Sequence, residues 1–162
     1  MQQSKNYTVS EAIKKLERYC AYQERCHLEV VQKLKGMKMI PQVIDHIVTH
    51  LINENYLNEE RFSRNFARGK FNIKKWGKNR IISELKQRQI SQYNIKAALS
   101  EIDDDSYLNA FDELAKKRLT QISEKNIQKR KRKLADYLLY RGWESHSVYS
   151  KIRELIYFYI PP

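Results

Sequence analysis

The chain has 162 residues, 41% hydrophobic and 31% charged, which is long enough to bury a core and fits an ordered, helix-rich soluble protein. Its net charge of +12 favours an anionic partner such as nucleic acid, an anionic membrane or an acidic protein surface, and four glycines and three prolines favour long helices. No apolar run is long enough to span a bilayer, residues 1–4 lack the pattern of a secretory signal, and two cysteines cannot make a disulfide framework, so we expect a cytoplasmic protein without membrane contact.

The first third of the chain predicts three helices. The first begins at Thr8, which has capping-box spacing with Glu11. The second spans about 26–35. The third carries Pro41 in its first turn, where a missing N–H costs nothing, and it stops near 55–56.

The middle third predicts three more helices. Asn58 is the expected N-cap of the fourth, whose apolar stripe continues to Phe71. Gly77 breaks the chain before the fifth helix, and Ser91 caps the sixth.

The last third continues the pattern. The acidic residues 103–105 are a favourable start for a seventh helix, because negative charge opposes the helix dipole there. The eighth helix spans roughly 126–140, and Ser145 caps a ninth that runs towards Tyr159.

One apolar pattern occurs three times at separations of 51 and 53 residues. Six columns are apolar in every copy, and their irregular spacing, which includes a turn, is not a generic helix pattern. The matched triplets are Val30, Ile81 and Leu134; Leu34, Leu85 and Leu138; Met39, Ile90 and Trp143; Ile44, Ile95 and Val148; Val48, Leu99 and Ile152; and Leu51, Ile102 and Leu155.

The repetition predicts an all-α fold of three tandem three-helix repeats that form an elongated, curved, right-handed array. The expected repeats cover residues 1–57, 58–102 and 103–162. The middle repeat is the most basic, because residues 59–102 hold 11 Lys and Arg against 4 Asp and Glu. We therefore expect an electrostatic contact to centre there.

A first candidate binding stretch lies in that middle repeat. Cations neutralise phosphates, and an exposed aromatic ring could stack on a base. The alternative is that the lysines form a solvated face while the tryptophan is a wedge between repeats. The residues are Lys70, Lys74, Lys75, Trp76, Lys78 and Arg80.

A second basic stretch precedes Leu134. Five consecutive like charges repel each other on a helix, a cost that DNA or an acidic protein would offset. The alternative is a frayed, solvated helix start. The residues are Lys125, Lys129, Arg130, Lys131, Arg132 and Lys133.

Other residue groups give weaker signals. Five tyrosines near the C-terminal end, at 137, 140, 149, 157 and 159, suit a contact surface or the edge of the core equally well. The cysteines at 20 and 26 and the histidines at 27, 46 and 50 lack the spacing of a zinc site. No catalytic motif occurs, so we expect no metal, no cofactor and no enzyme activity.

Three stretches resemble the RecX family of regulators of the RecA recombinase, and the resemblance covers about residues 10–157. They are Tyr56-Leu57-Asn58-Glu59-Glu60-Arg61-Phe62, Gly77-Lys78-Asn79-Arg80-Ile81-Ile82-Ser83-Glu84-Leu85 and Leu138-Leu139-Tyr140-Arg141-Gly142-Trp143. The chain departs from the family pattern at two turns, where Lys38 and Gln89 replace the glycine that Gly142 keeps.

The resemblance implies a non-enzymatic protein that binds RecA–DNA filaments along their groove and inhibits recombinase activity in DNA repair and homologous recombination. We expect a monomer that meets single- or double-stranded DNA directly or through the filament. The alternative is a stand-alone DNA-binding protein of helix-turn-helix type, with Asn79, Arg80, Gln87 and Arg88 facing the bases.

Overall fold

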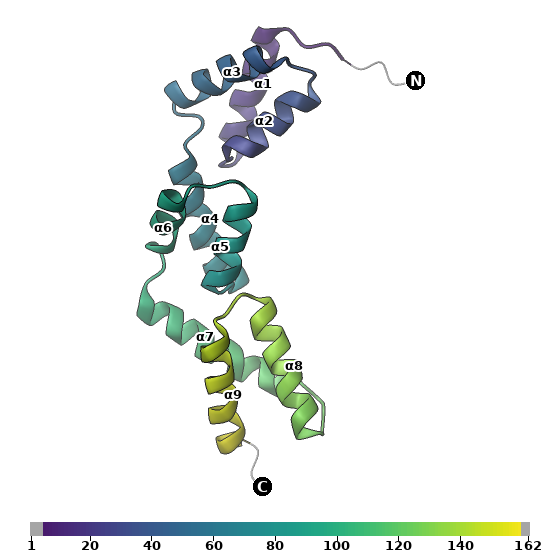
Figure 1. Cartoon of the computed structure of the whole chain (residues 1–162), viewed down its shortest axis with the longest axis vertical. Helices are drawn as coiled ribbons and strands as arrows, with labels where there is room; N and C mark the ends of the chain where they lie inside the picture. Colours follow the sequence, from purple (N-terminus) through teal and green to yellow (C-terminus); the bar gives the residue numbers. More distant parts are fainter. Residues whose placement is uncertain (1–4, 160–162) are drawn as a thin grey trace.

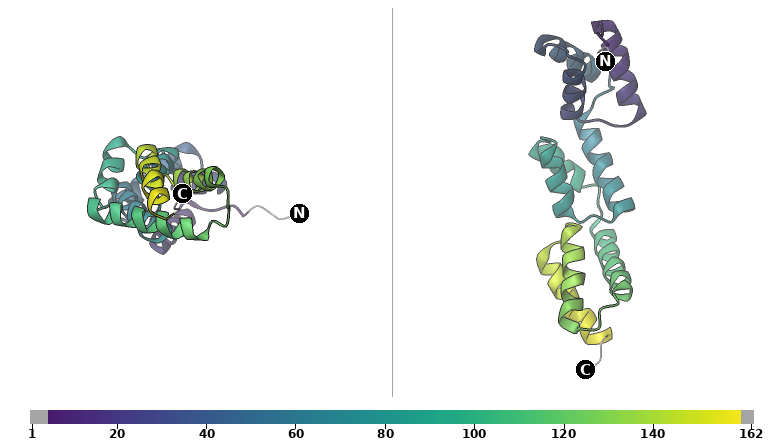
Figure 2. Two further views of the ribbon diagram at one scale, coloured as in Figure 1. Left: turned by 90° about the horizontal axis from the view of Figure 1, so that it is seen from below. Right: turned by 90° about the vertical axis from the view of Figure 1, so that its right-hand side faces the viewer.

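The computed structural model describes residues 5–159, so residues 1–4, the two final prolines and Ile160 lie outside it, as do the side chains of residues 158 and 159. Over the described range the chain forms nine helices and no strand, which confirms the predicted all-α repeat fold. Three three-helix units follow one another along the long axis of the molecule (Figure 1), and a side view shows the same succession (Figure 2).

The helices of the first unit are α1 (Val9–Tyr22), α2 (His27–Gly36) and α3 (Pro41–Asn53). Those of the second are α4 (Glu59–Lys74), α5 (Lys78–Gln87) and α6 (Gln92–Leu99), and those of the third are α7 (Asp104–Gln121), α8 (Ile127–Tyr140) and α9 (Ser145–Tyr159). The proposed limits of the three repeats stay a prediction, as does the right-handed sense of the array.

The polar residues expected at the helix starts form caps. The Thr8 hydroxyl accepts from the backbone N–H of Glu11 at 3.2 Å, and the Thr8 N–H donates to the Glu11 carboxylate at 2.9 Å. The Asn58 and Ser91 side chains accept from backbone N–H groups three residues ahead. Ser145 differs from its prediction, because it is the first residue of α9 and Glu144 precedes it.

The turn after the second helix of each unit has the same backbone geometry. Lys38 and Gln89 adopt left-handed φ angles of 60° and 58°, as Gly142 does at 91°. A side chain in this region costs about 1–2 kcal/mol, so the two substituted turns keep their shape against a local strain.

The eighteen matched apolar positions supply nearly half of the buried hydrophobic residues of the described chain. Fifteen are buried, and Met39, Val48 and Leu99 are half-buried. One cluster fills the first unit, whereas a second runs continuously through the second and third units and includes Cys26 from the start of α2. The second and third units are therefore one packed body in terms of their core.

Candidate functional site

The second and third units join through backbone hydrogen bonds at the start of α5. The Gly77 N–H donates to the Arg141 carbonyl at 2.8 Å, and the Asn79 N–H donates to the Gly142 carbonyl at 3.1 Å. The first N–H groups of a helix have no partner within it, so the turn after α8 satisfies the exposed end of α5.

Two glycines permit this approach. A Cβ on Gly77 would overlap the Gly142 carbonyl group, and a Cβ on Gly142 would overlap the backbone of Arg80. The sequence pattern indicated Gly77 only as a break before a helix, and did not reveal the contact. The only sequence signal for this contact was that one family-like stretch contains Gly77 and another contains Gly142.

Tyr107 completes the junction from α7. Its hydroxyl accepts from the Lys78 N–H at 2.9 Å and donates to the Glu144 carboxylate at 2.8 Å. Its ring packs on Trp143, with 4.5 Å between ring centres. Burial raises the pKa of Tyr107 far above its usual range, so the hydroxyl stays protonated and keeps both bonds.

A row of cations and aromatic rings crosses the outside of the junction. The Arg80 guanidinium carbon lies 4.1 Å from the ring centre of Trp76 and 4.8 Å from that of Tyr140. The Lys70 ammonium lies 4.9 Å from the Trp76 ring centre. Trp76 is half-buried and also meets Phe66 edge-on, so this ring lies at the boundary between units rather than standing free.

The remaining predicted cations of this stretch have two environments. The Lys78 ammonium is half-buried, 3.3 Å from the Asp104 carboxylate and 4.6 Å from the Tyr107 ring centre. Lys74 and Lys75 are exposed at the end of α4. We call Lys70, Lys74, Lys75, Trp76, Arg80 and Tyr140 the junction patch.

Five of the six cations of the second basic stretch lie in the first two turns of α8, and Lys125 precedes the helix. α8 begins seven residues before its first matched core position, Leu134, whereas α2 and α5 begin three residues before theirs. The third unit therefore carries one additional helical turn, made of residues 127–130. Its first turn contains no acidic residue, so cations lie at the positive end of the helix dipole.

Three of these six cations have protein partners. The Arg130 guanidinium donates to the Leu119 carbonyl at 3.0 Å. Lys133 lies 3.6 Å from the Glu124 carboxylate, and Arg132 lies 4.0 Å from that of Asp136. Lys125 and Lys129 are exposed, and Lys131 is half-buried beside a groove between α8 and α9.

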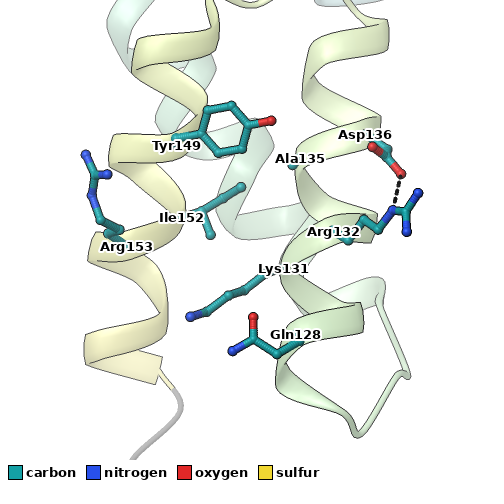
Figure 3. Close-up of a pocket in the computed structure, with 8 residues that line it drawn as sticks. All are labelled: Gln128, Lys131, Arg132, Ala135, Asp136, Tyr149, Ile152 and Arg153. Atoms are coloured by element: carbon teal, nitrogen blue, oxygen red, sulfur yellow. Dashed lines mark ion pairs between the residues drawn. The ribbon is translucent and has the colours of Figure 1, made fainter.

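The groove has a volume of about 430 Å3 (Figure 3). Its lining residues are Gln128, Lys131, Arg132, Ala135, Asp136, Tyr149, Ile152 and Arg153.

The structure does not bring the two basic stretches together. α8 ends at the junction patch with Tyr140, while the basic run occupies its opposite end (Figure 1). A helix of 14 residues is about 20 Å long, so the chain presents two separate positive regions.

The other candidate residues are scattered. Cys20 and Cys26 are buried in different clusters, and His50 Nε2 lies 2.8 Å from the Glu17 carboxylate. Within residues 5–159 no three metal-binding side chains converge. Tyr140, Tyr149 and the tyrosine at 157 are exposed, that at 137 is half-buried, and the side chain of that at 159 is not described.

The helix-turn-helix alternative has fewer free side chains than the sequence suggested. Asn79 and Gln87 are exposed, but Arg80 stacks on two rings and Arg88 lies 2.8 Å from the Glu84 carboxylate. Over the described part of the chain, no helix has an apolar stretch long enough to cross a bilayer.

Two family models match the chain. Residues 58–99 match the second three-helix domain of RecX, and residues 104–152 match the third. Crystal structures extend the likeness to the whole fold. RecX from Lactobacillus salivarius has a TM-score of 0.77 and 23% identity, with 93% of this chain and 97% of that one covered. Another, described as regulatory protein RecX, has a TM-score of 0.78 and 23% identity, with 90% and 71% covered.

Curated relatives have the same description. The regulatory protein RecX of Clostridioides difficile is 27% identical over 116 residues, which are 72% of this chain and 55% of the relative. That of Lactobacillus johnsonii is 31% identical over 101 residues, 62% of this chain and 37% of the relative. The regulatory protein RecX of Serratia proteamaculans is 31% identical over 114 residues, which are 70% of this chain and 66% of the relative. The chain thus spans about a third to a half of the length of the first two relatives, and it belongs to the RecX family of regulatory proteins.

Proposed function

We propose that this protein binds RecA–DNA filaments and inhibits recombinase activity during DNA repair and homologous recombination. The observation that carries the proposal is the junction patch, where exposed cations of α4 lie beside a packed row of Trp76, Arg80 and Tyr140. Cations at this position suit the phosphates or acidic groups of a filament.

The shape of the molecule suits the same partner. Three units in a row form an elongated body (Figure 2), and basic side chains lie at both ends of α8. Contacts at separate points raise effective affinity without any one strong contact, provided that the partner is itself extended and repetitive. The protein acts as a monomer in the cytoplasm, by binding rather than by catalysis, and without a cofactor or metal.

RecA ATPase activity on single-stranded DNA tests the proposal. The activity is titrated with this protein at two salt concentrations. We expect inhibition that weakens at the higher salt, because phosphate contacts release counterions. No inhibition, together with salt-dependent binding to bare DNA, would favour the stand-alone DNA-binding alternative.

Charge reversal locates the contact. We expect Lys74→Glu with Lys75→Glu to weaken filament binding about tenfold, because two cations that neutralise phosphates become anions. Lys14→Glu with Lys15→Glu in α1 is the matched control and should weaken binding much less. Lys78 is left out because it belongs to the packed junction. Equal weakening by the two pairs would contradict a contact centred on the middle of the chain.

A further inference from the structure

The groove between α8 and α9 has an apolar floor and a polar rim. Ala135 and Ile152 are buried at its base. Lys131 and Gln128 extend from α8 towards α9, while Tyr149 extends from α9 towards α8 (Figure 3). Tyr149 is 50% exposed, so one large aromatic surface is open to a ligand.

The charge around the groove is strongly positive. Residues 125–133 hold six cations and no acid. Within the described chain, Lys125, Lys129 and Lys131 make no ion pair. A polyanion near the start of α8 would therefore be attracted by several cations that no acidic side chain neutralises, and Lys131 is the one of them that lines the groove.

Contacts within the fold account for Arg130, Arg132 and Lys133, but not for Lys125, Lys129 and Lys131. The additional turn of α8 precedes the matched core positions, and its residues 127–129 are exposed. Like charges on successive turns repel each other, and cations at a helix start oppose the dipole. A segment that buries little and destabilises its own helix is best explained by a ligand that offsets the repulsion.

The remaining side chains distinguish between possible polyanions. A nucleobase has an aromatic face for Tyr149 and edge donors and acceptors for the Gln128 amide. A peptide of acidic residues would use the cations and the Gln128 amide, but it has no aromatic face to stack on Tyr149. A duplex is wider than its major groove, which alone measures about 12 Å. The axes of two packed helices lie only about 8–10 Å apart, so a duplex cannot enter the space between α8 and α9.

We propose that the α8–α9 groove binds single-stranded nucleic acid, with a base stacked on Tyr149 and a neighbouring phosphate on Lys131. The assignment deepens the function proposed above, on which it rests for the presence of DNA in the complex. It adds a second binding region about 20 Å from the junction patch. It also specifies the form of the ligand, which the charge of the chain alone leaves open.

The stacking of a base on Tyr149 is tested with a fluorescent 12-nucleotide oligothymidylate and the full chain, without recombinase. Fluorescence anisotropy should show that Tyr149→Ala weakens binding about tenfold, the effect expected for one base–aromatic stack. The matched control is Tyr93→Ala, since Tyr93 is an exposed tyrosine of α6, and it should bind as the wild type does. Photocrosslinking of a 5-iodouracil oligonucleotide should modify Tyr149.

The binding of phosphates is tested by salt dependence. Lys131→Glu should lower the slope of log K against log salt concentration by about 0.7, the change expected when one phosphate is no longer neutralised. Unchanged affinity in Tyr149→Ala, or equal competition by duplex DNA or by polyglutamate of the same charge, would overturn the assignment. ATPase inhibition measured on the same variants separates the two proposals, because inhibition that survives in Tyr149→Ala leaves filament binding intact.

Discussion

Gly142 combines two constraints at one residue. Its φ of 91° disfavours any side chain, and a Cβ would overlap the backbone of Arg80 across the junction. The turns at Lys38 and Gln89 tolerate side chains because they have only the first constraint. Among these three turns, glycine is kept at the one that the backbone of another unit approaches.

Gly142→Ala should therefore lower the free energy of unfolding by about 2 kcal/mol or more, since strain and a backbone clash add together. Chemical denaturation monitored by circular dichroism measures the change. Gly69→Ala is the matched control, because Gly69 lies within α4 and a Cβ there meets nothing. That variant should gain about 0.5–1 kcal/mol. Unfolding of Gly142→Ala at the wild-type midpoint would contradict the close approach.

The two cysteines are also defined by their surroundings. Burial raises the pKa of Cys20 and of Cys26 to about 11 from an ordinary value near 9. The thiolate is the reactive form, so both thiols should resist alkylation by iodoacetamide at pH 8 in the native protein and react on unfolding. Mass spectrometry of the labelled chain counts the adducts.

The same pKa shift predicts a decrease in stability at alkaline pH. Because the folded-state pKa is the higher one, the unfolded chain releases these protons first, and the free energy of unfolding should fall as pH rises from about 9 to about 11. Cys26→Ala should show a shallower fall over that interval. Rapid native labelling at pH 8 would contradict the burial of these thiols.

At the scale of helices, local chemistry was predictable and long-range contact was not. Thr8, Asn58 and Ser91 marked helix starts because a cap depends on residues three positions apart. The contact between Gly77 and Gly142 joins residues 65 positions apart, and no local pattern encodes it. The cations at 70–80 were predictable as a group, but their division between the junction and the surface depends on which ones the third unit covers.

The basic start of α8 should limit the stability of the protein while serving its binding function. Lys129→Glu replaces a cation by an anion at the positive end of the helix dipole and removes repulsion from its neighbours. We expect the free energy of unfolding to rise by about 0.5–1 kcal/mol at low salt and oligothymidylate binding to weaken. Thermal melting and anisotropy on the same sample measure the two effects.

The matched control makes the same substitution at the opposite, C-terminal end of a helix. Lys86 lies in the last turn of α5, where a cation is favourable, so Lys86→Glu should lower stability by a few tenths of a kcal/mol. If both substitutions shift stability in the same direction, the dipole and repulsion argument for α8 is wrong.

At the scale of the whole molecule, the two joints between units differ in kind. The second and third units share a core and backbone hydrogen bonds, whereas the first has its own cluster. The joint between the first and second units combines polar side chains with a small apolar contact, in which Cys26 and Leu28 pack against the second cluster. Arg61 Nε donates to the Glu24 carboxylate at 2.6 Å, and the His27 N–H donates to the Glu59 carboxylate at 3.1 Å. This joint is therefore the one that salt should weaken.

We expect the first unit to unfold separately from the other two. Native-state hydrogen exchange in low denaturant should give α2 a smaller opening free energy than α5 and α8, which should share one value because they share one core. Arg61→Ala should lower the opening free energy of α2 by about 1–3 kcal/mol. The Glu24 Oε2 atom is already buried without a hydrogen bond, and the substitution would leave Oε1 without its partner as well. Arg68→Ala removes a more exposed ion pair with Glu101, so it should leave the opening free energies of α2, α5 and α8 nearly unchanged. One opening free energy for all three helices would mean that the polar joint couples the units as strongly as the shared core does.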